Sequence, residues 1–318
     1  FRFKIIIKFT TQMIRKFTFL LFLFLLFSCS SSESSDNSDD INEINSENIT
    51  ENTSSSDNSS SSNTATTSNN STSSNDTNEN YPDFIDAMKL RIFAKEGVST
   101  EFLQNVGKTY EAMLAEGEKI DESMRTLYLN TSEENYVYQR VGLDGSQAVS
   151  NFEPGDPPAP FVDNATDFIW QMEQGGADQI GEVIEHLLHT VTNVILYLSF
   201  PEEWDYNNPS SQLSLAMQES IDKGIYDISD YNELLDNDPE IYKKILTQEY
   251  AYWLILAEWD YYVVAGKKED GISGNGEFTI GTPAEISETL PLGHELYKNF
   301  VEKILTEPDK EIIVPLFQ

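Results

Sequence analysis

The residues best suited to chemistry lie in one segment, residues 181–195. Its polar side chains recur at spacings of three and four, which places them on one face of a helix. They are Glu182, Glu185, His186, His189 and Asn193. The residues between them are nearly all apolar and cover most of the helix circumference, so we expect this helix in the protein interior. Charged groups that are buried without partners are costly, and this polar stripe must therefore meet hydrogen-bond partners, a metal ion or a water-filled cleft.

Two of the three histidines of the chain lie on the polar stripe, and two arrangements would satisfy them. One is a structural network in which each histidine bonds a nearby carboxylate. The other is a metal site, because side chains at positions i and i+4 of a helix can reach the same ion. Glu185 and His189 have that spacing. Glu182, His186 and His189 also share a face, at i, i+4 and i+7, so the spacing leaves both ligand sets open.

A third ligand for Glu185 and His189 has to come from another part of the chain. Glu249 is a candidate, because it precedes about a dozen residues that are nearly all apolar or aromatic. A carboxylate at the start of such a run is expected to be buried rather than solvated. The alternative is an ordinary glutamate on the helix surface, one turn before the apolar run begins.

The sequence EHLLH at residues 185–189 resembles the HExxH motif of zinc peptidases with its first two letters exchanged. The resemblance implies a zincin-like motif helix, with Glu185 and His189 as metal ligands and Zn²⁺ as the metal. In the gluzincin branch of these peptidases a glutamate on a later helix completes the site, and Glu249 matches that position. The activity that the resemblance implies is metal-dependent hydrolysis of a peptide.

The exchanged letters change the expected roles. A carboxylate can ligate zinc and a neutral imidazole can act as a base, so the set is chemically possible. His186 stands where the family has its catalytic glutamate, and His186 or Glu182 is therefore the expected base. Residues 136–140 and 249–253 also resemble segments of a family of secreted bacterial proteins, from which no activity carries over.

The N-terminal residues have the order of a secretory leader. The basic residues Arg15 and Lys16 precede an apolar run over residues 17–27, which is too short to span a bilayer comfortably. The sequence Leu-Phe-Ser-Cys at residues 26–29 resembles the lipobox of bacterial lipoproteins, which implies lipidation of Cys29. Cys29 is the only cysteine of the chain and has no internal disulfide partner.

We therefore expect a signal peptide over residues 1–28, of which residues 1–12 precede the first methionine and are treated as upstream reading frame. The mature protein would be exported and held by its lipid to a bacterial membrane, at the outer membrane or the cell surface. Residues 29–80 are expected to be a disordered tether, because residues 30–80 are mainly Ser, Asn, Thr, Asp and Glu. Residues 81–318 hold all four tryptophans and all fifteen tyrosines and are expected to form a single globular domain.

The net charge of −34 argues against nucleic acid as a partner, since phosphate binding needs clustered Lys and Arg. The apolar spacing predicts a mostly α (α+β) fold, a helical domain with a small antiparallel sheet. Two helices are expected over residues 81–129, with a break near 97–99 and with Ser99 or Thr100 as the cap of the second. Further helices are expected over residues 164–173, 178–199, 210–223, 239–265 and 292–306. Strands are expected over residues 136–141, 148–152 and 277–280.

Two functions follow from these observations. The first is a lipoprotein with a zincin-like, metal-binding domain that hydrolyses or binds a peptide or protein outside the cell. The second is a non-catalytic surface lipoprotein, in which the polar stripe is a structural network and the function is binding or structural. The two differ in whether Glu185, His189 and Glu249 converge on one point.

Overall fold

The structure, a computed structural model, describes residues 76–143, 155–267 and 276–318. The leader, Cys29, nearly all of the tether and the strand predicted over residues 148–152 lie outside the described residues. Among the helices that the structure describes, none combines the length and the apolar character that crossing a membrane requires.

Four strands form one sheet in the order β1-β2-β3-β4. They are β1 (Asp83–Ala87), β2 (Leu90–Ala94), β3 (Tyr138–Leu143) and β4 (Phe168–Gln171). β1 and β2 pair antiparallel, whereas β2 with β3 and β3 with β4 are parallel pairs. The sheet is therefore mixed rather than antiparallel throughout, and the strand predicted over residues 136–141 is confirmed as β3.

The hairpin β1-β2 replaces the first of the two helices predicted over residues 81–129. Met88 and Lys89 form its turn with φ of 44° and 65°, the positive values that a tight two-residue hairpin requires. Phe84, Met88 and Ile92 suggested a helix because they are spaced by four residues. Four is also twice the strand period of two, so this spacing does not distinguish a helix from a strand.

The described part of the chain is mainly helical, which confirms the mostly α (α+β) prediction. The helices are α2 (Thr100–Met113), α3 (Glu122–Glu134), α5 (Ala177–Thr190), the π-helix η1 (Val191–Leu196), α6 (Tyr197–Ser199), α7 (Pro201–Trp204), α8 (Gln212–Asp222), the 3₁₀ helix η2 (Ser229–Tyr231), α9 (Asn232–Asn237), α10 (Pro239–Glu258), α11 (Pro283–Thr289), α12 (Pro291–Leu296), the π-helix η3 (Tyr297–Val301), α13 (Glu302–Ile304) and α14 (Lys310–Leu316).

Most predicted helices are confirmed with shifts at their ends. α2 is capped by Ser99, whose Oγ accepts a hydrogen bond from Phe102 N. The helix expected over residues 239–265 ends at Glu258. Three further predictions were wrong. The second helix expected within residues 81–129 is divided into α2 and α3, and the strand β4 occupies the place of a helix over residues 164–173. Residues 277–280 contribute only an isolated bridge between Phe278 and Tyr226.

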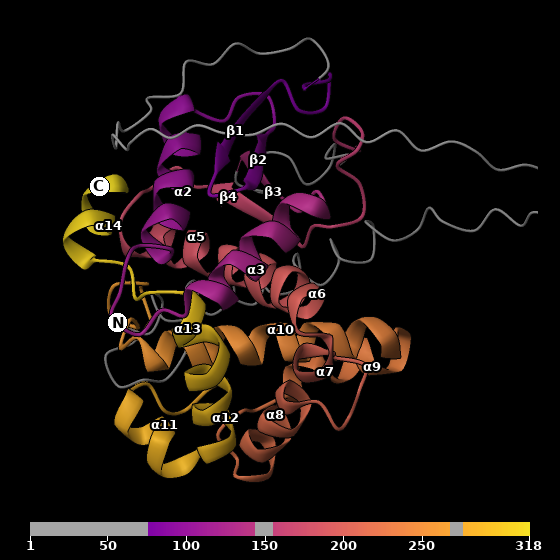
Figure 1. Ribbon diagram of the computed structural model, residues 1–318, viewed down its shortest axis with the longest axis vertical. Coiled ribbons are helices and arrows are strands. Elements are labelled where there is room, and N and C mark those ends of the chain that lie inside the picture. Colours follow the sequence, from indigo (N-terminus) through magenta and orange to yellow (C-terminus); the bar gives the residue numbers. More distant parts are fainter. Residues whose placement is uncertain (1–75, 144–154, 268–275) are drawn as a thin grey trace, which may run out of the picture. The chain divides into compact units, whose positions relative to one another are not determined.

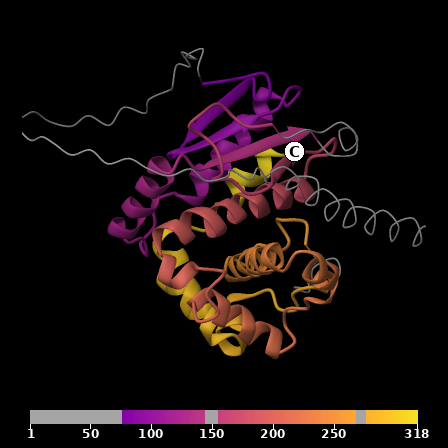
Figure 2. The ribbon, with the colours of Figure 1, turned by 90° about the vertical axis from the view of Figure 1, so that its right-hand side faces the viewer.

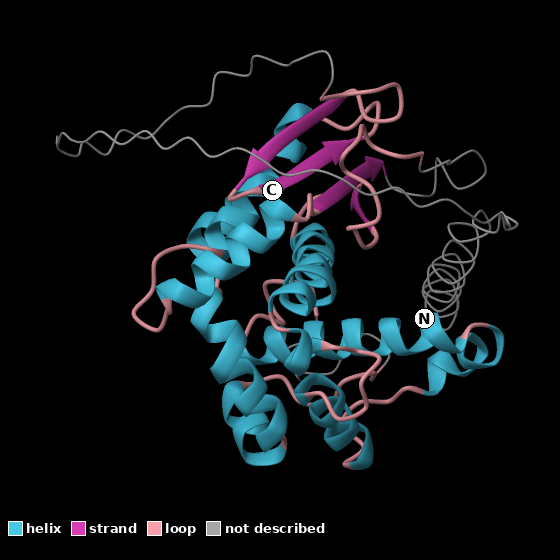
Figure 3. Cartoon of the chain, turned by 45° about the vertical axis from the view of Figure 1, so that its right-hand side comes forward, coloured by secondary structure: helices cyan, strands magenta, loops and turns pink. Residues whose placement is uncertain are grey.

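The two faces of the sheet are both apolar but are covered differently. α2 packs on β1 and β2, and α5 packs on β3 and β4, so these helices cover one face. On the other face lies a small aromatic cluster of Tyr81, Phe84, Phe93, Tyr138 and Phe168. Figures 1 and 3 show the strands gathered at one end of the helical part, and Figure 2 shows α5 running beneath them.

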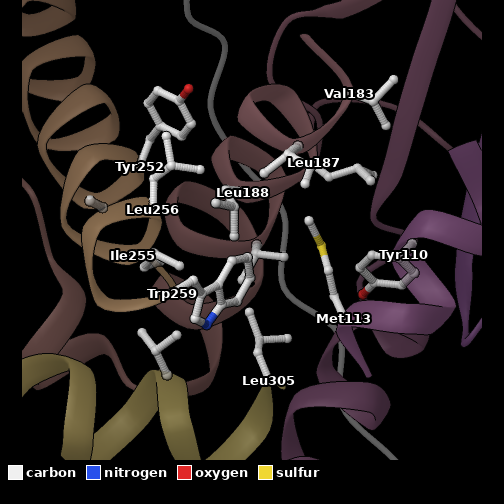
Figure 4. Packing of buried hydrophobic residues seen from close by; sticks show 14 of the residues in the cluster. Tyr110, Met113, Val183, Leu187, Leu188, Tyr252, Ile255, Leu256, Trp259 and Leu305 are labelled. Carbon is white, nitrogen blue, oxygen red and sulfur yellow. The ribbon is translucent and has the colours of Figure 1, made fainter. Parts of the chain in front are cut away.

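The main core lies between α5 and α10, which pack on each other. Figure 4 shows how their side chains meet the neighbouring helices. α5 contributes Val183, Leu187 and Leu188, and α10 contributes Tyr252, Ile255 and Leu256. Tyr110, Met113, Trp259 and Leu305 pack with them, and all of these residues are buried. Because α5 is enclosed by the sheet on one side and α10 on the other, its polar stripe has little access to water.

α5 passes directly into the π-helix η1 after Thr190. π-helical turns are rare and occur mostly as bulges in α-helices, often next to functional residues. η1 holds Asn193, the last member of the polar stripe, and directs it at α10, where Asn193 Nδ2 donates to Lys244 O at 3.2 Å.

A glycine lets α5 approach the turn that follows α10. A Cβ at Gly181 would lie 2.3 Å from the carbonyl oxygen of Ala265, far inside van der Waals contact. The backbone cannot yield as a flexible side chain would. Gly181 therefore fixes how near α5 lies to residues 261–267.

We predict that Gly181→Ala lowers the free energy of unfolding by about 1–3 kcal/mol, the usual cost of overpacking. Urea unfolding of the chain from residue 30, followed by circular dichroism, measures the change. Gly107→Ala in α2 is the matched control, because the one close contact of its Cβ would be with the end of the flexible Ile85 side chain. An equal decrease in the free energy of unfolding of both variants would contradict the close approach at Gly181.

Candidate metal centre

The centre is built around Asp167, which lies directly before β4. Asp167 Oδ2 lies 3.0 Å from His186 Nδ1 and 3.0 Å from His189 Nδ1. Both histidines are on α5 and are buried, with His189 fully inaccessible. One carboxylate oxygen therefore contacts both imidazoles of the polar stripe.

Hydrogen bonds from the sheet and from α5 hold Asp167 in place. Gln139 Nε2, on β3, donates to the Asp167 carbonyl at 3.0 Å. The Thr190 hydroxyl donates to Gln139 Oε1 at 2.5 Å and lies 2.9 Å from the hydroxyl of Thr166. Because these groups are buried and mutually bonded, Asp167 faces α5 with little freedom to move.

His186 lies between two carboxylates. Its Nε2 is 3.1 Å from Glu182 Oε1, and its Nδ1 faces Asp167. Glu182 Oε1 also accepts a hydrogen bond from Trp170 N at 3.0 Å, which ties α5 to β4. Both ring nitrogens of His186 thus face carboxylates. The role of His186 or Glu182 as a base stays a prediction.

A second set of converging groups lies on the other side of His189. Ligand atoms of Glu185, His189 and Glu249 lie within 4.8 Å of one another. His189 Nε2 is 3.6 Å from Glu249 Oε1 and makes no hydrogen bond within the described part of the chain. The structure thus brings together the three residues that the sequence suggested as metal ligands.

The amide of Gln248 borders both sets, and its orientation is fixed. Asn193 Nδ2 donates to a backbone carbonyl and, at 2.9 Å, to Gln248 Oε1, so Gln248 must present its Nε2 to the centre. That nitrogen lies 3.0 Å from His189 Nδ1 and 3.4 Å from Asp167 Oδ2. The polar end of the stripe therefore also orients the groups around His189.

Glu185 marks the side of the centre nearest to solvent. Its side chain is 23 % exposed, and so is that of Lys267, whose Nζ lies 3.5 Å from Glu185 Oε2. Lys267 also lies over the rings of Tyr252 and Trp253, at 5.7 and 5.3 Å from their centroids. Tyr252 packs edge-on against His189.

Burial and mutual repulsion dominate the electrostatics of Glu249. Burial raises the pKa of Glu249 to about 8; His189 opposes the shift, and the nearby carboxylates of Glu185 and Glu277 add to it. Glu277 in turn accepts a hydrogen bond from Tyr231, behind Glu249. A carboxyl in this environment binds a proton or another cation readily.

Asp167 and His186 show the opposite balance. Burial works to raise the pKa of Asp167, but His186 and His189 hold it well below its usual range. Burial works to lower the pKa of His186, but Asp167 and Glu182 raise it well above the ordinary value. These groups stabilise one another as an ion-paired cluster.

The structure contains two of the possible ligand sets, and they share His189. Among the residues that the structure describes, His/Cys/Asp/Glu groups that can hold a metal ion are Asp167-His186-His189 and Glu185-His189-Glu249. The alternative set Glu182-His186-His189 is not among them. Sequence reasoning missed Asp167 because it placed a helix over residues 164–173; a polar pair directly before the apolar residues 168–170 was the available signal.

Comparison of the chain with protein-family models, with curated proteins and with solved structures finds no match. The character of the site therefore rests on its own geometry.

We predict that the stability of the metal-free protein falls with rising pH more steeply than that of Glu249→Gln. The folded Glu249 has a pKa of about 8 against an ordinary 4.5, so between these values the folded state holds a proton that the unfolded state has lost. Because of this one proton, the free energy of unfolding falls by about 1.4 kcal/mol for each unit by which the pH rises. The difference in slope between the two proteins between pH 5 and 8 is therefore about 1.4 kcal/mol per unit.

Urea unfolding at several pH values in the presence of a chelator measures both slopes. Glu295→Gln, at an exposed position on α12, is the control and should keep the original slope. Parallel curves for the original protein and Glu249→Gln would show that Glu249 is ionised in the folded state.

Proposed function

We propose that this protein is an exported lipoprotein whose folded domain carries a zinc site and hydrolyses peptides outside the cell. One observation carries the proposal. The fully buried His189 directs a ring nitrogen without a hydrogen bond at Glu249, in a group that includes Glu185, while Asp167 holds its other nitrogen. Metal-binding histidines usually have such a carboxylate on the second nitrogen, which orients the ring and strengthens it as a ligand.

The donor set suits zinc. Zinc in proteins is bound by imidazole nitrogens and carboxylate oxygens, and three protein ligands leave a position for water or substrate. Glu185, His189 and Glu249 would hold the ion, which would supply Lewis-acid activation of a carbonyl or of bound water. The partly exposed side of the centre, at Glu185 and Lys267, is where a peptide would approach.

The proposed location rests on the leader. The basic and apolar residues before Cys29 support export, and the lipobox-like residues 26–29 support a lipid anchor at the outer membrane or the cell surface. The polar residues 30–80 would then hold the domain away from the membrane.

A structural role for the polar stripe is the competing proposal. It is favoured by the burial of His189 and by the pairing of both histidines with carboxylates, which would satisfy these groups without a metal. The protein would then be a non-catalytic lipoprotein that binds a partner or has a structural role. Metal content separates the two proposals.

We predict that zinc remains bound after dialysis and that His189→Ala and Glu249→Ala each lose at least one equivalent. Both variants remove a ligand of the same ion, and elemental mass spectrometry measures the loss. Matched controls are His294→Ala and Glu295→Ala, in α12, which should keep the full zinc content. His294 pairs with Glu258 rather than with the centre. Folded protein without zinc would support the structural role.

We further predict that the zinc-loaded protein cleaves members of a fluorogenic peptide library, and that Glu249→Ala cuts at background rate. The reason is that loss of a ligand removes the ion that activates the carbonyl or the water. Chelation should abolish cleavage and added zinc should restore it. Bound zinc without any cleavage would leave metal binding in place and would contradict the peptidase activity.

A further inference from the structure

His189 contacts the two ligand sets through opposite nitrogens of one ring. Nε2 faces Glu249, which forms one set with Glu185, and Nδ1 faces Asp167 beside His186. We propose that the centre holds two divalent metal ions, the second bound by Asp167, His186 Nδ1 and His189 Nδ1, with the His189 imidazolate as the bridge. The first ion is the zinc of the proposed function, on which this inference rests.

The spacing around Asp167 fits an ion. Ligand atoms that bind one zinc at about 2.0–2.2 Å lie roughly 3 to 3.5 Å apart. The two distances from Asp167 Oδ2 to the Nδ1 atoms of His186 and His189 are both 3.0 Å. The His186 and His189 rings meet at 78° with centroids 5.2 Å apart, so the two rings approach the carboxylate from different directions.

The polar contacts of Asp167 are unevenly shared between its two oxygens. Oδ2 has three nitrogen neighbours, on His186, His189 and Gln248. Oδ1 is buried and has no hydrogen bond within the described part of the chain. Three nitrogens therefore gather at one carboxylate oxygen, while the other oxygen is left without a hydrogen bond. One ion bound by Oδ2 and by the two imidazole nitrogens would use this gathering of ligand atoms.

His186 is already arranged as a ligand with an outer partner. Its Nε2 can keep its proton and donate to Glu182, which leaves the lone pair of Nδ1 for the ion. The second ion displaces the proton of His189 Nδ1, which is released to solvent. His189 then becomes an imidazolate that binds one ion through each nitrogen.

Metal stoichiometry tests the proposal. The full-length protein, purified in detergent, is stripped with a chelator, reloaded with Zn²⁺, dialysed and analysed by elemental mass spectrometry. We expect two equivalents in the original protein and in His294→Ala. We expect one equivalent in His186→Ala and in the nearly isosteric Asp167→Asn, which serves if His186→Ala does not fold.

The outcomes distinguish this inference from the proposed function. Two equivalents that fall to one in the variants support the two-ion centre. One equivalent in the original protein and in His186→Ala overturns the second ion and leaves the zinc site intact. Two equivalents in all proteins overturn the assignment to His186 and Asp167. No zinc in the folded original protein overturns both proposals.

A magnetic measurement tests the bridge and needs no variant. With Cu²⁺ in both positions, an imidazolate couples the two spins, so the electron paramagnetic resonance signal should fall well below that expected from the copper content. In His186→Ala the signal should match the remaining copper. An unreduced signal from protein with two bound Cu²⁺ would overturn the bridge.

Discussion

The contact of Asp167 Oδ2 with the imidazoles of His186 and His189 is the interaction on which the rest of the centre depends. It joins the loop before β4 to α5, and through Gln248 it reaches α10. Three elements that are distant in the sequence are thereby held at one point. Removing Asp167 would take away the one carboxylate that the two buried histidines share, and buried charges that lose a partner are costly.

The apolar packing around α5 explains why its polar groups need these specific partners. α5 is enclosed by the sheet and by α10, so its polar groups have few water molecules to pair with and must be satisfied by protein groups or ions. Buried electrostatic interactions are also stronger than exposed ones. The same enclosure leaves the Glu185 side as the part of the centre nearest to solvent, and in the proposed function an ion and a substrate would approach from that side.

The sequence was sufficient for some parts of the site but not for others. Glu185, His189 and Glu249 could be predicted, because a polar stripe on an apolar helix and a carboxylate before an apolar run are local signals. Asp167 could not, since β4 is only four residues long and its neighbours fit a helix as well. The hairpin β1-β2 was missed for a similar reason, the ambiguity of a spacing of four. The placement of Lys267 and Gln248 at the centre depends on tertiary contacts, which the spacing of residues along the chain does not reveal.

The π-helix η1 has a consequence for how this chain can change during evolution. A π-helical turn amounts to one residue more than the α-helix needs, so a single-residue deletion within 191–196 would restore a regular helix. The segment after the deletion would then turn by about 100° about the helix axis. A deletion before Asn193 would turn Asn193 away from α10, while His189 and Glu185, about one and two turns earlier, would keep their directions. Insertion and deletion at η1 can thus alter the outer groups of the centre separately from the residues proposed as its ligands.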